Sequence, residues 1–211
     1  MTAHAGHRHD HPHPRQPDLE DQPFDYHQLM AEAIGELLIA KGVFAAADLR
    51  RTIEAIDARS PADGARLVAR AWRDPAFKAR VLEDVNAAAG ELGIEAGAIP
   101  IRALENTSRL HNVVVCTLCS CYPRGLLGLP PDWYKARAYR SRMVRAPRAV
   151  LAEFGTRIPG EVEIRVHDST ADLRYLVLPL RPAGSEGMDE ADLAALVTRD
   201  CMIGTALPGP L

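Results

Sequence analysis

The octapeptide VCTLCSCY, residues 115–122, holds three of the four cysteines in this chain of 211 residues. Cys116, Cys119 and Cys121 follow the spacing C-x-x-C-x-C, which is too tight for ordinary disulfide pairing. Cysteines clustered in this way are typical of a metal-binding or catalytic site in a reducing compartment. The fourth, Cys201, stands alone in the sequence, and we expect it to pack as a small hydrophobic residue.

Ordinary metal sites leave part of this cluster unexplained. A structural zinc ion needs four side-chain ligands, and nearby only His111, five residues before the first cysteine of the cluster, could add a fourth. An iron–sulfur cluster likewise needs four protein ligands, whereas a thioredoxin-like pair uses only two cysteines. Each of these interpretations therefore lacks a ligand or leaves a cysteine unused.

A planar metal site uses the whole cluster. Cys119 and Cys121 flank one residue, so chelate rings can close through the deprotonated backbone nitrogens of Ser120 and Cys121. Cys116 can then supply an axial sulfur, and a sixth position is left for water or substrate. Trivalent cobalt or iron can stabilise deprotonated amides, whereas zinc has no such preference. The spacing is therefore compatible with a trivalent metal ion.

The bulk composition limits the functional classes. Apolar residues make up 47% of the chain, and a formal net charge of −3 gives no general attraction to nucleic acid or anionic membranes. No apolar run approaches the length of a membrane span, and the first residues lack a hydrophobic signal segment. We therefore expect a cytoplasmic protein without nucleic-acid or membrane partners. The basic stretch from Lys135 to Arg148 is expected to make ion pairs between subunits.

The chain divides into three predicted regions. Residues 1–21 contain five of the eight histidines among prolines, which predicts a disordered His-rich tail, although such tracts also bind metal weakly. Residues 22–95 show helical spacing and are expected to form a helical arm. Residues 96–211 are expected to form the catalytic metal-binding domain. The arm's expected helices cover about 24–42, 46–59, 63–73 and 74–93.

The second half of the chain mixes strands with helices. A mostly helical stretch is expected over residues 131–154, interrupted at Pro147, and a last helix over 188–197. The expected strands, rich in β-branched and apolar residues, are 99–104, 112–116, 161–166 and 174–178. These elements predict an α+β fold, in which an N-terminal helical arm precedes a layered α/β/α metal-binding domain.

The cysteine cluster and its flanks also carry a family resemblance. Its central segments are VVVCTLCSCYP at 113–123 and LGLPPDWYK at 127–135. Further matches are YRSRMV at 139–144, AEFG at 152–155, RY at 174–175, RPAG at 181–184 and VTRD at 197–200. Together these segments resemble the α subunit of nitrile hydratase over most of the chain after about Asp25.

The resemblance implies an activity and a cofactor. Enzymes of this family hydrate a nitrile to an amide at a non-corrin cobalt(III) or non-haem iron(III) centre, and Thr117 is similar to the cobalt class. By resemblance, the metal ligands are Cys116, Cys119, Ser120 and Cys121, and the catalytic residues are Cys119, Ser120 and Cys121. Cys119 is expected as sulfinic acid and Cys121 as sulfenic acid, while Cys116 stays a thiolate.

The same resemblance implies partners. A β subunit is expected to supply two arginines to the oxidised cysteines through charge-assisted hydrogen bonds, in a heterodimer or heterotetramer. A cobalt-insertion activator protein is a further expected partner. The metal is expected to act as a Lewis acid, polarising the nitrile or activating water.

Several residues depart from the nitrile hydratase pattern. Arg124-Gly125 stands where many nitrile hydratases have Trp-Pro, and this makes the chain similar to the γ subunit of thiocyanate hydrolase, as Cys201 also does. His167 replaces a common Trp, and no Gln occurs at 95–97. Arg124 is either a cation of the substrate pocket or a surface partner of another subunit. The alternative function is thus conversion of thiocyanate to carbonyl sulfide and ammonia, and a third is a non-catalytic, metallochaperone-like metal binder.

Overall fold

The computed structural model describes residues 25–209, which divide into two compact units at Arg50/Arg51. The first unit contains α1 (Tyr26–Ala40) and the start of α2 (Ala46–Asp57). Asp25 begins α1 with a reciprocal cap. Its carboxylate accepts a hydrogen bond from the Gln28 backbone N–H, and the Gln28 side chain accepts one from the Asp25 backbone N–H. The predicted tail lies outside the described residues.

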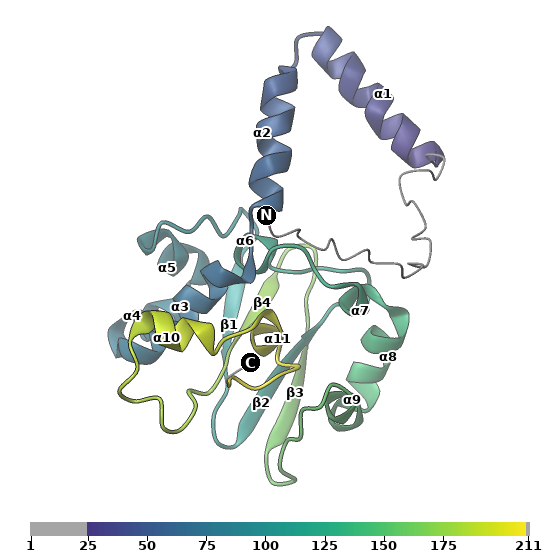
Figure 1. The fold of residues 1–211 in the computed structure, drawn as a ribbon. Helices are drawn as coiled ribbons and strands as arrows, with labels where there is room; N and C mark the ends of the chain where they lie inside the picture. Colours follow the sequence, from purple (N-terminus) through teal and green to yellow (C-terminus); the bar gives the residue numbers. More distant parts are fainter. Residues whose placement is uncertain (1–24, 210–211) are drawn as a thin grey trace, which may run out of the picture. The chain divides into compact units, whose positions relative to one another are not determined.

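The second unit contains two pairs of parallel strands. β1 (Ile101–Glu105) pairs with β4 (Arg174–Leu178), and β2 (Leu110–Val115) pairs with β3 (Glu163–Asp168). Helices gather on both sides of these strands (Figure 1). One group is α3 (Pro61–Arg73), α4 (Pro75–Glu83), α5 (Val85–Glu91) and α10 (Glu190–Ala195); the other is α7 (Asp132–Lys135), α8 (Arg137–Arg145) and α9 (Pro147–Glu153).

This arrangement confirms the predicted α+β class, and the strand expected at 174–178 is found there. The single helix expected over 74–93 is wrong, because the chain breaks at Asp84, which has extended backbone angles. The Asp84 carboxylate accepts a hydrogen bond from the Ala87 N–H at 3.0 Å and so begins a second helix. Two short helices were not expected, namely α6 (Arg124–Leu127) and α11 (Arg199–Ile203). Placing a domain boundary at residue 95 stays a proposal.

An aromatic cluster holds α7, α8 and the end of α9 together. Trp133 packs edge-on against Tyr139 and Phe154, with ring centroids 4.9 and 4.8 Å apart. The Tyr139 hydroxyl donates to the Val114 carbonyl at 2.8 Å, which ties α8 to β2. Within residues 25–209, no helix is both long enough and apolar enough to span a bilayer.

A buried polar network fixes the start of β2. The ring of His111 donates from Nε2 to the Gly204 carbonyl at 2.8 Å and accepts at Nδ1 from Asn106 at 3.2 Å. Asn112 joins the network through Asn106 Oδ1, and His167 Nε2 donates to Asn112 Oδ1 at 2.9 Å. His167, at the position of a family Trp, thus has a structural role in this chain.

We predict that protonation of His111 weakens the fold. Burial lowers the pKa of His111 below its ordinary value, so the unfolded chain binds more protons as the pH falls through about 6.5. The free energy of unfolding should therefore decrease on acidification from pH 7.5 to 5.5, more steeply in the wild type than in His111→Gln. Urea titrations across this range measure the slopes, with His27→Gln on exposed α1 as control. Equal slopes in wild type and His111→Gln would contradict the assignment.

Candidate metal centre

The cysteine loop, residues 116–121, begins where β2 ends and is here called the claw. β2 and β3 run parallel and in register, with Val115 paired to Asp168, so both strands end at the same edge. Val115 is fully buried and anchors the start of the loop, whereas Leu118 at its tip is 88% exposed. The fold therefore presents the claw at the carboxyl edge of a parallel strand pair, a usual location for functional groups.

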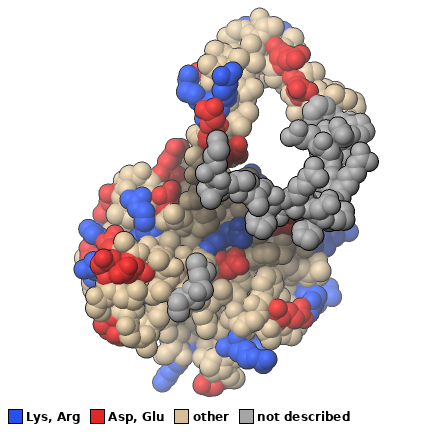
Figure 2. Space-filling model, in the orientation of Figure 1, with Lys and Arg blue, Asp and Glu red and all other residues tan. Residues whose placement is uncertain are grey.

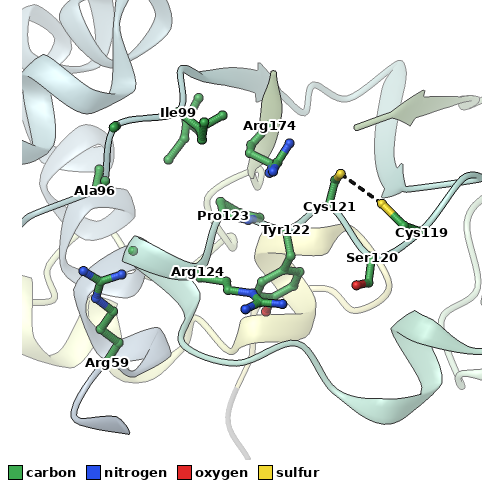
Figure 3. Close-up of a pocket in the computed structure, with 14 residues that line it drawn as sticks. Arg59, Ala96, Ile99, Cys119, Ser120, Cys121, Tyr122, Pro123, Arg124 and Arg174 are labelled. Carbon is green, nitrogen blue, oxygen red and sulfur yellow. Dashed lines mark hydrogen bonds between the residues drawn. The ribbon is translucent and has the colours of Figure 1, made fainter. Parts of the chain in front are cut away.

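The three thiols converge within the claw. Cys116 Sγ lies 3.6 Å from Cys119 Sγ, which lies 3.3 Å from Cys121 Sγ (Figure 3 shows the second pair). The three sulfurs all lie within 4.8 Å of one another, and no other group of three potential metal-ligating side chains occurs in the described chain. Side chains up to five positions apart thus present three soft ligands to one point, an arrangement suited to a metal ion.

The surroundings of the claw shift the pKa values of two of its thiols in opposite directions. Hydrogen bonds from the thiols of Cys121 and Cys116, and then from the backbone N–H of Ser120, lower the pKa of Cys119. Burial, followed by the neighbouring thiols, raises the pKa of Cys121 to about 12. The backbone N–H groups of Ser120 and Cys121 both approach the Cys119 sulfur. Two amide nitrogens therefore lie beside the sulfur cluster and could complete a ligand set.

Three side chains hold the claw from outside. The Asp168 carboxylate accepts from the Thr117 N–H at 2.8 Å and from its hydroxyl at 2.5 Å. Arg140 Nη1 donates to the Thr117 carbonyl at 3.2 Å, and the Tyr134 hydroxyl donates to the Cys121 carbonyl at 2.8 Å. Asp168 was missed by sequence reasoning, because only the parallel β2–β3 pairing brings it to Thr117.

The two other ligands considered from the sequence are not in the cluster. Both ring nitrogens of His111 are engaged, by Asn106 and by the Gly204 carbonyl, so this ring is not available to a metal. Cys201 is buried in the hydrophobic core, as expected, with its sulfur 3.2 Å from the Thr198 hydroxyl. Among the described residues, the tetrahedral zinc site therefore lacks a fourth side-chain ligand.

A pocket of about 400 Å³ opens beside the claw (Figure 3). Its lining includes three guanidinium groups, from Arg59, Arg124 and Arg174, and no carboxylate. Arg174 lies beside Cys121 and opposes the rise in that thiol's pKa. Its Nη1 is buried and has no hydrogen-bond partner among the described residues. The pocket is therefore positively charged and holds an unpaired donor next to a cysteine.

Gly125 sets one wall of this pocket. A Cβ at Gly125 would lie 2.2 Å from the Ala96 carbonyl oxygen, which is closer than backbone atoms tolerate. Only glycine lets the 94–98 segment approach α6 in this way, and this segment supplies Ala96 and Gly97 to the lining. The Arg124-Gly125 departure noted in the sequence thus changes the backbone of the wall as well as its charge.

Comparison with known proteins agrees with this geometry. The family model described as "Nitrile hydratase, alpha chain" matches residues 25–206. The chain is 57% identical over 151 residues to the low-molecular weight cobalt-containing nitrile hydratase subunit alpha of Rhodococcus rhodochrous, covering 70% of this chain and 72% of the relative. It is 45% identical over 195 residues to the thiocyanate hydrolase subunit gamma of Thiobacillus thioparus, covering 87% and 80%.

A solved structure of an Fe-type nitrile hydratase from Comamonas testosteroni, a double mutant, has the same fold. It superposes with a TM-score of 0.76 at 43% identity, covering 88% of this chain and 95% of the other. The proteins similar to this chain thus include one named as cobalt-containing and one named as Fe-type. This chain belongs to the nitrile hydratase alpha-chain family.

Proposed function

We propose that this chain is the metal-bearing subunit of a nitrile hydratase, which adds water across a carbon–nitrogen triple bond to give an amide. The observation that supports it most strongly is the convergence of three cysteine sulfurs at the edge of a pocket. The family model and the cobalt-containing relative support the same chemistry. The pocket also has apolar walls, including Ile99 and Ile101, that suit the body of a nitrile.

The proposed ligands are the three cysteine sulfurs and the backbone nitrogens of Ser120 and Cys121. Their approach to the Cys119 sulfur supports this set. We propose cobalt(III), on the basis of Thr117 and the cobalt-containing relative, with iron(III) as the alternative. Cys119 is proposed to carry two added oxygens and Cys121 one. The unpaired Arg174 Nη1 beside Cys121 would then have an oxygen to bond.

A bound trivalent metal would supply Lewis acidity toward the substrate nitrogen or a water molecule. The chain's own residues prepare the site for it. Asp168, Arg140 and Tyr134 fix the loop, so the thiols need little rearrangement on binding. Arg174 offsets negative charge at the sulfurs, and the buried Cys116 shields the cluster from solvent on its inner side.

A second subunit is proposed to complete the enzyme. Leu118 is almost fully exposed at the tip of the claw. In the first unit, α1 has no buried residue in the described chain, although Tyr26, Leu29, Ile34 and Leu37 are large and apolar. Both relatives are named as subunits. We propose a β subunit that supplies arginines to the oxidised cysteines in a heterodimer or heterotetramer, and an activator that inserts cobalt.

Thiocyanate hydrolysis is the second candidate, because the pocket charge favours an anion. Arg59, Arg124 and Arg174 line the pocket without a carboxylate, and the thiocyanate hydrolase subunit is similar over most of the chain. Thiocyanate contains the same carbon–nitrogen triple bond as a nitrile, so one centre could hydrate either. Charge at the pocket wall, above all Arg124, would then decide between them.

The purified complex should contain cobalt at about one ion per chain and convert a simple aliphatic nitrile to its amide. Elemental analysis and product chromatography measure both quantities.

Arg124→Gln should lower turnover of thiocyanate relative to that of the nitrile by about 10-fold, because one cationic contact to an anion contributes about 1.4 kcal/mol. Ammonia from thiocyanate with no amide from nitriles would reverse the ranking. Metal-loaded protein with unmodified cysteines and no turnover would indicate a metallochaperone-like role.

Removing the Asp168 carboxylate should loosen the claw. Asp168→Ala deletes both acceptors of Thr117, so we expect metal affinity to fall by about 10- to 100-fold, as is usual when groups that orient ligands are removed. Competition with a chelator measures the affinity. Asp172→Ala is the matched control, since that exposed carboxylate lies in the turn that follows Asp168, between β3 and β4, and accepts no hydrogen bond within the described chain. Equal metal affinities in the two variants would refute the role of Asp168 in holding the claw.

A further inference from the structure

A second hollow lies on the outer side of the claw, distinct from the pocket described above. It has a volume of about 570 Å³ and is formed by the claw tip and one face of α8. We call it the α8 groove. It is lined by Thr117, Leu118, Arg137, Arg140, Ser141, Val144 and Arg145.

The α8 groove has three guanidinium groups and no carboxylate among its lining residues. Arg140 is already engaged by the backbone carbonyls of Lys135 and Thr117. The side chains of Arg137 and Arg145 make no hydrogen bond or ion pair with any other part of residues 25–209. Within the described chain, these two cations on one face of α8 therefore lack an anionic partner.

Other arginines on α8 and α9 do have hydrogen-bond or ion-pair partners within the described chain. Arg142, also on α8, pairs with the Glu153 carboxylate of α9. Arg148 donates to the carbonyls of Ile158, Pro159 and Val162. Where the chain has its own acceptors, arginines use them. Among the arginines of α8 and α9, the side chains without a partner in the described chain are therefore Arg137 and Arg145, and both line the groove.

The groove also exposes apolar surface. Leu118 is 88% and Val144 52% exposed, and both line the groove beside the unpaired arginines. An exposed leucine next to cations is typical of a protein interface, in which an apolar contact is surrounded by charge pairs. Because Leu118 lies between Thr117 and Cys119, whatever covers it also reaches the claw.

We propose that the α8 groove is the docking surface for an acidic segment of the second subunit. Carboxylates of that segment would pair with Arg137 and Arg145, and an apolar side chain would cover Leu118 and Val144. The proposal rests on the proposed function only in requiring a second subunit. Its consequence is that charge pairing on α8 places the partner beside Cys119 and so helps to complete the site.

The observations favour a protein over a nucleic acid. The chain has a net charge of −3, and acidic and basic side chains are interspersed on the face shown in Figure 2. A short groove with two unpaired cations and two exposed apolar side chains provides few phosphate contacts. It provides what an acidic peptide segment with an apolar anchor requires.

The proposal is tested by measuring how tightly the full chain binds its second subunit when the two are co-expressed. Arg137→Glu/Arg145→Glu should raise the dissociation constant by about 100-fold or more, since each lost charge pair costs about 10-fold. Sedimentation velocity over a dilution series measures it. The control, Arg109→Glu/Arg157→Glu, makes the same charge change at exposed arginines that precede β2 and β3, at the opposite end of those strands, and should leave the constant unchanged.

A second measurement identifies the partner group. With Arg137→Lys, a carbodiimide that joins amines directly to carboxylates should link position 137 to an Asp or Glu of the second subunit. Dissociation constants that match the control, or the absence of any complex, would overturn the proposal. Binding of a fluorescein-labelled single-stranded RNA that is lost in Arg137→Glu/Arg145→Glu, with unchanged subunit assembly, would also overturn it. Groove-dependent assembly without nitrile turnover would support docking and refute the proposed function instead.

Discussion

The carboxylate of Asp168 holds both the backbone N–H and the hydroxyl of Thr117, and the position of the claw depends on this contact. It arises because β2 and β3 run parallel and in register, so both strands deliver their last residues to one edge. Tyr134 and Arg140 hold the loop through its carbonyl groups. A loop fixed in this way keeps three thiols together before any metal binds, which reduces the ordering cost of binding.

The claw lies between two electropositive hollows, for which different functions are proposed. The inner pocket, with Arg59, Arg124 and Arg174, lies beside the sulfurs and suits a small substrate. The outer α8 groove, with Arg137 and Arg145, lies beside the claw tip and suits an acidic partner. Of these cations, Arg174 favours the thiolate of Cys121, although burial raises the pKa of that thiol overall. The proposed substrate, partner and metal would therefore all bind at the same short loop.

Sequence spacing was sufficient to predict the cluster of Cys116, Cys119 and Cys121, because residues so close together in one loop lie near one another in any fold. It was also sufficient for the strands and most helices, whose apolar periodicity is local. It could not show Asp168 or Arg174 beside the claw, because strand pairing brings them there from over fifty residues away. The break at Asp84 was missed because a side-chain cap competed with helical propensity.

The central claim is that one trivalent metal ion binds three cysteine sulfurs and two backbone nitrogens. X-ray absorption spectroscopy at the metal edge of the loaded complex tests it most directly, because it reports the metal, its oxidation state and its nearest atoms together. We predict a cobalt(III) spectrum with three sulfur and two nitrogen neighbours supplied by Cys116, Cys119, Ser120 and Cys121. A divalent ion in tetrahedral coordination, or a shell with an imidazole in place of the amide nitrogens, would contradict it.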